Sequence, residues 1–348
     1  MSHPITTSHA AALAETTPPV RRLTGLKPTG RLHLGNLIGA IRPMLAAQDV
    51  GEPAPERNIV ALVDLHALTV EHRPHEVRAT TLEHATILLA AGLDPARSTM
   101  YVQSQVSQHT ELHYLLECVT GFGEAQRMIQ FKEQTAKGHN RLSLLTYPVL
   151  MAADILLHDT EEVPVGDDQT QHLELARAIA TRFNTRYGDT FIVPRAANPV
   201  VAGRIMDLTD PGVKMGKSAT SGHGVLYLLD PPDVLRRKIR RAVTDATGRV
   251  RYDPVSQPGL ANLLAILAAV TGTDPAAAAE EFRSYGQLKY AVTDAVIGLL
   301  APIQRRYTTL AAEPARVRQI LTQGRDRAAE RAAATVARAR RALGLLVA

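Results

Sequence analysis

The sequence contains no tryptophan and only one cysteine, Cys118. One cysteine can form neither a disulfide within the chain nor a cysteine-ligated zinc site. No apolar run reaches the length of a membrane span, and residues 1–19 lack the basic start and apolar core of a secretory signal. We therefore expect a cytoplasmic protein without a membrane segment, in which residues 1–19 form a disordered tail.

The net charge of +5 is unevenly distributed along the 348 residues. Residues 1–229 carry 20 Lys and Arg against 23 Asp and Glu, whereas residues 230–348 carry 19 against 11. The basic excess therefore lies in the C-terminal third, where it would attract a polyanion such as nucleic acid. A solvated helical surface explains the same charge, and composition alone leaves both explanations open.

Short apolar runs alternate with helical patterns through the first half of the chain. The predicted strands cover residues 20–26, 58–65, 98–106 and a short segment that begins at 163. Helices are expected to begin near Gly35, to cover residues 74–91 and to dominate residues 109–158. This alternation favours an α/β fold with a doubly wound parallel sheet, whose ligands bind at the carboxyl ends of the strands. His66 would lie at such an end.

The stretch from Thr29 to Ala40 joins the first strand to the first helix. The free N–H groups at the start of that helix would face an anion such as a phosphate, and His33 adds a donor one turn earlier. A glycine turn that binds nothing is an equal alternative. Residues 163–169 repeat the arrangement, and there Gln169 could reach a ribose or a base edge.

One carboxylate, Asp154, stands among apolar residues in the run 144–157. An ionised group in such surroundings is costly unless it has a partner. Asp154 therefore either has a structural donor or awaits a donor from a ligand, and the residues leave both possibilities open. The run His109-Thr-Glu-Leu-His113 is not a zinc-protease motif, because that motif needs Glu directly after the first His.

The loop of residues 210–224 is rich in glycine and serine and carries Lys214 and Lys217. It is not a phosphate-binding loop of the Walker type, because only three residues separate Gly212 from Gly216. It could still bring two lysines onto a polyphosphate, or it could be a solvated loop. Beyond Asp230 we expect only helices, at about residues 235–243, 260–270, 290–307 and 316–345.

Two short motifs together indicate a family. His33-Leu-Gly-Asn36 resembles the His-Ile-Gly-His signature of class I aminoacyl-tRNA synthetases, and Lys214-Met-Gly-Lys-Ser218 resembles their Lys-Met-Ser-Lys-Ser loop. Within that class, the bacterial tryptophanyl-tRNA synthetases are similar at Gly25–Gly30, Leu145–Pro148, Met151–Ile155, Val163–Gln169 and Ala242–Asp245. The resemblance extends from about Arg21 to the C-terminus.

The resemblance implies that tryptophan attacks the α-phosphate of ATP and that the resulting adenylate is transferred to the 3' end of tRNA(Trp). Catalysis would rest on positioning and on neutralising phosphate charge. The implied catalytic residues are His33, Asn36, Lys214, Lys217 and Ser218. The implied ATP-binding residues are Lys27, Thr29, Gly35, Asn36, Gly166, Asp168, Gln169, Ile205, Lys214, Met215 and Lys217. Mg²⁺ would accompany ATP, and the sequence shows no protein ligand for it.

The resemblance also gives Asp154 a role as acceptor of the indole N–H of tryptophan, which can only donate. The implied substrate-binding residues are Leu26, His66, Tyr147, Met151, Asp154, Val163, Val165 and Gln169. A site built on one such hydrogen bond strongly rejects analogues that lack the donor.

The chain departs from the family pattern at Lys27, where many members have Gln, and at Gly216, where Ser is usual. The absence of tryptophan suggests a hypothesis of its own. An enzyme without tryptophan can still be made when charged tRNA(Trp) is scarce, so this chain could be a second, inhibitor-tolerant copy. Chance is the simpler explanation.

The expected architecture is a Rossmann-type catalytic domain, a doubly wound parallel sheet over residues 20–224, followed by an all-helical C-terminal domain. Residues 225–330 would bind the tRNA anticodon, and the last helix, about 331–348, would pack back on the catalytic domain. The resemblance implies a homodimer. The alternatives are a tyrosyl-tRNA synthetase, a non-catalytic paralogue that binds tRNA, and a small-molecule nucleotidyltransferase.

Overall fold

The computed structural model describes residues 20–136, 138–139, 141–166, 169–197, 204–216 and 222–346. The predicted tail of residues 1–19 lies outside these ranges. So do three predicted site residues, namely Asp168, Lys217 and Ser218.

Five parallel strands form one sheet in the order β3-β2-β1-β4-β5. The strands are β1 (Arg22–Leu26), β2 (Asn58–Leu62), β3 (Thr99–Val102), β4 (Glu162–Pro164) and β5 (Arg195–Ala197). The chain winds outward from β1 in one direction to β3 and then returns to β4 on the other side, which confirms the doubly wound α/β fold. The sequence did not predict β5, because its three residues have no buried apolar side chain.

Two strands are shorter than predicted. β2 ends at Leu62, and residues Asp64–Ala67 form the short helix α3, so His66 lies on a helix and not at the end of the strand. β3 ends at Val102 and continues as the 3-10 turn η2 (Gln103–Gln105). The carboxylate of Asp64 accepts hydrogen bonds from the N–H and the hydroxyl of Ser104, at 2.9 and 2.5 Å, and so ties the two turns together.

The helix after the first strand begins where the sequence predicts, although its middle is widened. α1 (Leu34–Asn36), the π-helical η1 (Leu37–Ile41) and α2 (Arg42–Gln48) follow one another without a break. α4 (Pro74–Ala91) has the predicted bounds, with proline in its first turn and Gly92 at φ 120° just after its end. Leu37, Ile41 and Leu88 belong to the core on this face of the sheet.

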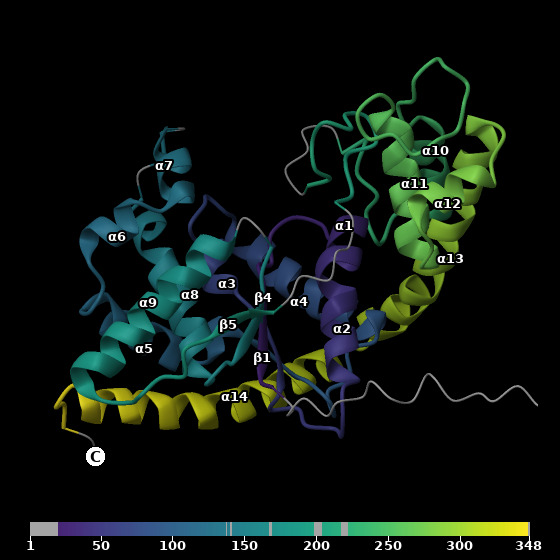
Figure 1. Cartoon of the computed structure of the whole chain (residues 1–348). Coiled ribbons are helices and arrows are strands. Elements are labelled where there is room, and N and C mark those ends of the chain that lie inside the picture. Colours follow the sequence, from purple (N-terminus) through teal and green to yellow (C-terminus); the bar gives the residue numbers. More distant parts are fainter. Residues whose placement is uncertain are drawn as a thin grey trace, which may run out of the picture.

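The other face of the sheet is covered by α5 (Gln108–Glu117), α8 (Ser143–Leu157) and α9 (Thr170–Tyr187), which lie together on the left of Figure 1. The short helices α6 (Phe122–Gln126) and α7 (Ile129–Ala136) extend this group. In the described part of the chain, no helix is long and apolar enough to cross a membrane.

The C-terminal part is helical, as predicted. It contains α10 (Pro232–Arg240), α11 (Pro258–Thr271), α12 (Pro275–Glu280), α13 (Tyr285–Ala311) and α14 (Pro314–Ala342). The first of these ends at Arg240, before the predicted end at residue 243, and Val243 is 48% exposed. Lys238 is partly buried, and its ammonium donates to Asp230 and to the carbonyl of Val225 at 2.7 Å each.

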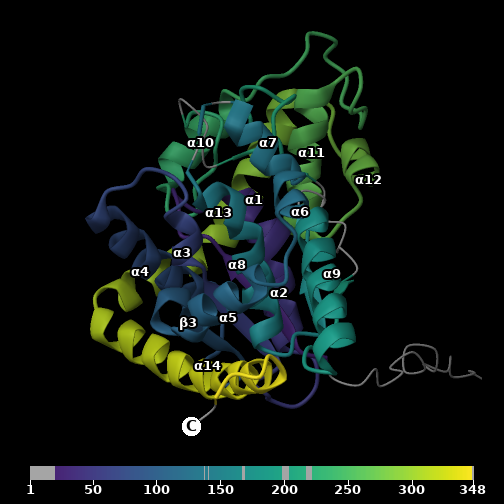
Figure 2. The ribbon, with the colours of Figure 1, turned by 90° about the vertical axis from the view of Figure 1, so that its left-hand side faces the viewer.

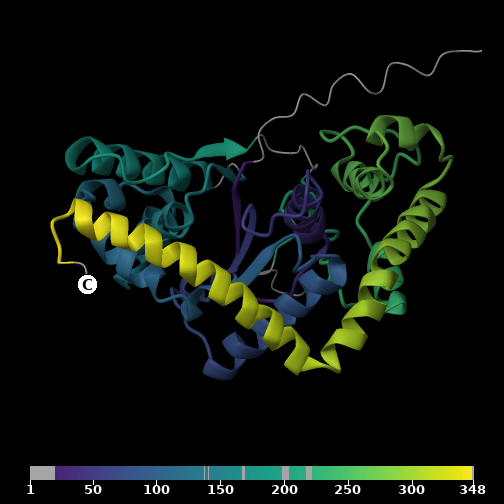
Figure 3. The same ribbon diagram turned by 90° about the horizontal axis from the view of Figure 1, so that it is seen from below.

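The last helix, α14, crosses beneath the whole sheet, as the view from below shows (Figure 3). It is seen along the lower edge of the molecule in Figure 2 as well. A Cβ atom at Gly324 would lie 1.9 Å from the carbonyl oxygen of Met100 in β3, so only glycine permits this approach. Ala328, Ala332 and Ala339 continue the buried contact with the second core. Small residues therefore bring the helix close to the strands.

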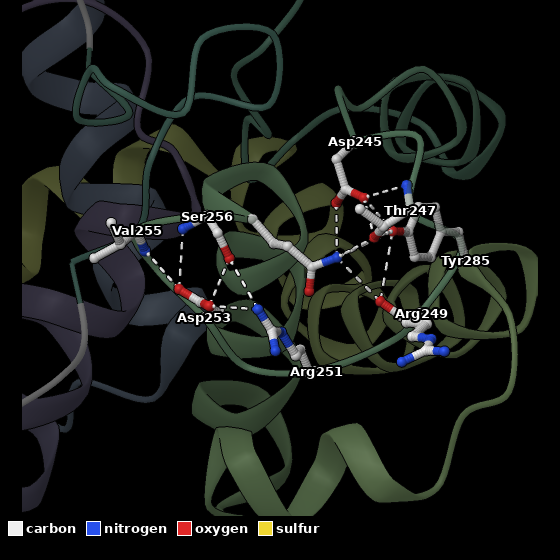
Figure 4. A network of polar contacts seen from close by, with 9 residues as sticks. Asp245, Thr247, Arg249, Arg251, Asp253, Val255, Ser256 and Tyr285 are labelled. Carbon is white, nitrogen blue, oxygen red and sulfur yellow. Dashed lines mark hydrogen bonds and ion pairs between the residues drawn. The ribbon is translucent and has the colours of Figure 1, made fainter.

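A polar network fixes the connection between α10 and α11 (Figure 4). Asp245 accepts hydrogen bonds from the Thr247 N–H at 2.7 Å, the Tyr285 hydroxyl at 2.5 Å and the Gln257 amide at 3.0 Å. These bonds, with Thr247 first among them, hold the pKa of Asp245 below its usual range. The network thereby ties the connection to the start of α13.

Candidate functional site

Several predicted site residues of the described ranges lie near the point where the sheet changes direction, between β1 and β4. Leu26 ends β1, and Val165 follows β4. Just beyond β1, the ammonium of Lys27 donates to the Thr69 hydroxyl at 3.2 Å, and burial lowers its pKa. Thr29, which comes two residues later, is half-buried. Gly166, which follows β4, is exposed. In doubly wound folds this crevice is where ligands bind.

The first helix and the lysine loop meet over this crevice. The backbone N–H of buried His33 donates to the Asn36 side chain at 3.1 Å, which fixes the start of α1. A Cβ atom at Gly35 would lie 3.1 Å from the His33 ring and 3.9 Å from the carbonyl oxygen of Met215. The two motifs that lie far apart in sequence are therefore adjacent in space.

Main-chain contacts hold the lysine loop. Met206 and Lys214 form an antiparallel bridge, and the Met215 N–H donates to the Ile205 carbonyl at 3.0 Å. From α11, the side chain of Asn262 bonds both the N–H and the carbonyl of Met206, at 2.9 Å each. Lys214 itself is exposed, so the loop presents its cation to solvent while buried Ile205 and Met215 anchor it.

Asp154 on α8 is buried, 3% exposed, and it has protein partners. Its Oδ2 lies 2.8 Å from His66 Nε2, and its Oδ1 accepts the Gln103 amide at 2.6 Å. The same Oδ1 lies 2.7 Å from His109 Nδ1, an ion-pair contact whose alignment falls short of a good hydrogen bond. Of the two possibilities that the sequence left open, the structure shows a structural set of donors.

These partners decide the charge of Asp154. Burial acts to raise the pKa of its carboxyl, but His109 and His66 outweigh burial and hold that pKa below its usual range. Asp154 is therefore a carboxylate at neutral pH. A carboxylate has about four acceptor positions, and the three contacts leave one of them on Oδ2 for a further donor.

Behind Asp154 a second layer of side chains connects to the strands. The hydroxyl of Tyr101 in β3 lies 2.9 Å from His109 Nε2 and 2.7 Å from His158 Nε2, and all three residues are fully buried. The sequence missed Gln103 and His109 as partners of Asp154. Gln103 carried no signal, because the predicted strand extended past it to residue 106, and His109 carried none except a rejected zinc motif.

Tyr147, Met151 and Asp154 share one face of α8, because they are spaced by four and three residues. The ring of Tyr147 lies 6.2 Å from that of His66 in an edge-on arrangement, and burial raises its pKa to about 12. Its hydroxyl also lies 2.9 Å from buried His172.

The remaining predicted substrate residues lie around β4. Val163 is buried within that strand, Val165 is partly buried behind it, and the Gln169 N–H closes the following turn onto the Gly166 carbonyl at 2.9 Å. The structure thus brings together the predicted substrate residues on α3, α8 and β4. Within the described ranges, no group of three or more His, Cys, Asp or Glu residues could hold a metal ion.

Comparisons with known proteins agree with this arrangement. The family model described as "tRNA synthetases class I (W and Y)" matches residues 15–301. Among the curated relatives, "Tryptophan--tRNA ligase 1" of Streptomyces coelicolor is 53% identical over 331 residues, which is 94% of this chain and 97% of that protein.

Solved structures show the same similarity. Tryptophanyl-tRNA synthetase from Mycoplasma pneumoniae aligns with a TM-score of 0.83 and 36% identity, covering 94% of this chain and 98% of that one. The enzyme from Campylobacter jejuni, solved with ADP and tryptophan, aligns with a TM-score of 0.79 and 31% identity, covering 93% and 100% of the two chains.

Proposed function

Because this chain belongs to the family of class I tRNA synthetases for tryptophan and tyrosine, we propose that it is a tryptophan–tRNA ligase. It activates L-tryptophan with ATP to tryptophanyl-adenylate and transfers the amino acid to the 3' end of tRNA(Trp). The bacterial relatives named for this activity cover nearly the whole chain. ADP and tryptophan in the Campylobacter jejuni enzyme support ATP and tryptophan as the substrates.

The observation that carries the choice of amino acid is the free acceptor position on Asp154 Oδ2. Gln103, His109 and His66 hold the carboxylate ionised and oriented. An indole N–H only donates and is satisfied by this acceptor, whereas a phenol hydroxyl both donates and accepts and would need an additional donor in the pocket. Tyr147, Met151, Val163 and Val165 would supply the apolar walls, together with Leu26.

The nucleotide is assigned to the opposite side of the crevice. We assign His33, Asn36 and the N–H groups near Gly35 to the phosphates, and Lys214 with Lys217 and Ser218 to the leaving pyrophosphate. Such groups act by stabilising charge that develops on phosphate oxygens, so no protein nucleophile is needed. Lys27, Thr29, Gly166, Asp168, Gln169, Ile205 and Met215 would border the nucleotide.

Mg²⁺ bound to ATP would neutralise part of the phosphate charge. The described residues offer no cluster of acidic or histidine side chains for the ion. We therefore assign the ion no protein ligand.

We assign adenylate formation to residues 20–224 and contact with the tRNA anticodon to the helical residues 225–330, where the basic excess begins. The last residues, from about 331, belong with the catalytic part, since Ala332, Val336 and Ala339 lie in its second core. A homodimer would cover the exposed side chains of Tyr114 and Phe122, which are 66% and 68% exposed. A tRNA substrate implies a cytoplasmic location.

We further propose that the enzyme is a second, inhibitor-tolerant copy. Two features support this: the chain has no tryptophan, and Lys27 replaces the usual Gln beside the substrate side. Measuring inhibition by indole-type inhibitors in parallel with a housekeeping enzyme tests it, and equal sensitivity would count against it.

The function is tested by charging of purified tRNA(Trp) and tRNA(Tyr), each with its own amino acid and ATP. The proposal expects only tryptophan on tRNA(Trp). Charging of tyrosine instead would favour the tyrosyl family, and binding of tRNA without charging of either would favour a non-catalytic paralogue.

A further inference from the structure

A cavity of about 540 Å³ lies beneath the sheet, on the side opposite the proposed active site. It is bounded by α14 and by residues at the amino ends of the strands, including Glu56 before β2 and Thr99 at the start of β3. His158 and Asp159, which follow α8, complete the wall. Of these residues, only His158 also belongs to the layer behind Asp154 described above.

Two buried polar atoms of this wall lack partners in the described part of the chain. The hydroxyl of Thr99 and the Nδ1 atom of His158 make no hydrogen bond, and their residues are 3% and 0% exposed. Buried polar groups are ordinarily hydrogen-bonded, so each such atom calls for a partner inside the cavity. A ligand or ordered water with polar atoms would satisfy both.

Positive charge converges on the same place. The guanidinium of Arg338 pairs with the carboxylate of Asp159, and that of Arg331 lies 3.8 Å from the same carboxylate. Arg21 donates to the Asp159 carbonyl at 3.0 Å, and its pKa is lowered by burial and then by repulsion from Arg331. The Asp159 carboxylate therefore faces the guanidinium groups of Arg331 and Arg338, while Glu161 and Glu56 act on Arg21 as well. Glu56 and Glu330 also line the cavity, but both are exposed at its rim.

We propose that this cavity binds a small oxyanion, a phosphate or a carboxylate group, held by Arg331 and Arg338 with the Thr99 hydroxyl and the His158 ring. Arginine presents a fork of N–H donors that matches both anions. An anion would supply the acceptor that the two buried atoms lack.

The site is connected to Asp154 by a chain of buried contacts. His158 Nε2 contacts the Tyr101 hydroxyl, which contacts His109, which in turn contacts Asp154. When the Nε2–H of His109 donates to the Tyr101 hydroxyl, that hydroxyl donates to His158 Nε2. The proton of neutral His158 then lies on Nδ1, where it can donate to the anion. Anion binding thus fixes the direction of these hydrogen bonds and the orientation of the His109 ring beside Asp154, a coupling that rests on the proposed tryptophan pocket.

Calorimetric titration with inorganic phosphate, and separately with acetate, against chloride at equal ionic strength tests the site. Arg331→Gln should weaken binding at least tenfold, whereas Arg325→Gln should stay within twofold, because Arg325 pairs with Asp326 on the same helix outside the cavity. Lys214→Ala, a change on the proposed nucleotide side, should leave phosphate binding at this cavity unchanged. Unchanged binding in Arg331→Gln, or loss in Lys214→Ala, would overturn the site.

Thr99→Val provides a second test if Arg331→Gln misfolds, and it should weaken phosphate binding several-fold; unchanged affinity would overturn the hydroxyl's role. Tighter binding of phosphate than of acetate would identify a tetrahedral anion as the ligand, and tighter binding of acetate would identify a carboxylate.

The coupling has its own readout. Saturating phosphate should tighten tryptophan binding several-fold in the unmodified protein, and Tyr101→Phe should abolish that effect while it still binds phosphate. A persistent effect in Tyr101→Phe would overturn the coupling and leave the site intact. Failure to bind tryptophan at all would contradict the proposed function and leave the phosphate titration valid.

Discussion

The amino-acid side and the nucleotide side of the site are held by different kinds of contact. Around Asp154, side chains from η2, α3 and α5 bond directly to one buried carboxylate. On the other side, the Lys214 loop is anchored by main-chain bonds and by Asn262, while its lysine stays exposed. Under the proposed function, selectivity would rest on a buried cluster that is fixed before the ligand arrives, and charge neutralisation on a lysine exposed to solvent.

This difference predicts how variants should behave. A change in the Asp154 cluster should affect folding and amino-acid binding together, because the same contacts serve both. A change at Lys214 should affect only the ATP-dependent step. Variants of Lys214 that lose stability together with activity, or variants of the Asp154 cluster that lose only one of the two, would contradict this difference.

Asp154→Ala should have the largest effect. It removes the carboxylate and leaves His109 and His66 facing a buried space without their counter-charge, which costs about 3–5 kcal/mol. Tryptophan-dependent pyrophosphate exchange should fall by roughly 100-fold or more, and the melting temperature should drop as well. Asp189→Ala, the same change at an exposed position outside the site, serves as the control. Exchange within tenfold of normal in Asp154→Ala would remove the aspartate from its role.

Lys214→Ala should reduce the ATP-dependent rate by about 100-fold, as expected for loss of a group that stabilises charge in the transition state. Its melting temperature should be unchanged because the side chain is exposed. Kinetics at saturating tryptophan together with a thermal melt check both points. A large loss of stability would show that the loop is structural.

Asn262→Ala should destabilise the chain by about 2 kcal/mol, because the buried N–H and carbonyl of Met206 lose their partner. The ATP-dependent rate should fall modestly while tryptophan affinity stays the same. Urea unfolding and equilibrium binding of tryptophan measure the two effects. Weaker tryptophan binding with normal stability would show that the Lys214 loop also affects the amino-acid pocket, contrary to the difference described above.

The smallest predicted effect concerns pH. Burial lowers the pKa of His158 well below its ordinary value of 6.5, so the unfolded chain binds more protons than the folded one just below that pH. Stability should therefore fall as the pH drops from 6.5 to 5.5, by at most about 1.4 kcal/mol for this group. Unfolding in urea across that interval measures it, and His158→Gln should flatten the dependence. A flat profile in the unmodified protein would mean that folding does not lower the pKa of His158.

The sequence predicted the elements that have strong local patterns. The helix Pro74–Ala91 was predicted with its correct bounds, because proline and glycine mark its ends. The alternation of strands and helices gave the fold class, whereas β5 and the ends of β2 and β3 were missed or misplaced. Those boundaries depend on tertiary contacts such as that between Asp64 and Ser104, which no local pattern encodes.

The candidate site shows the same division. His66, Tyr147 and Asp154 were predicted together, and the structure places them in contact. His109 and Gln103 were not predicted as partners, since they are separated from Asp154 by 45 and 51 residues and reach it only through the fold. Side-chain partners of this kind follow from three-dimensional packing, and neither composition nor spacing reveals them.

The most direct test of the account is amino-acid-dependent ATP–pyrophosphate exchange with tryptophan and tyrosine in parallel, using the unmodified protein. The account predicts rapid exchange with tryptophan and little with tyrosine, because the pocket around Asp154 is set for one N–H donor. Exchange that depends on tyrosine, or no exchange with either amino acid, would contradict it.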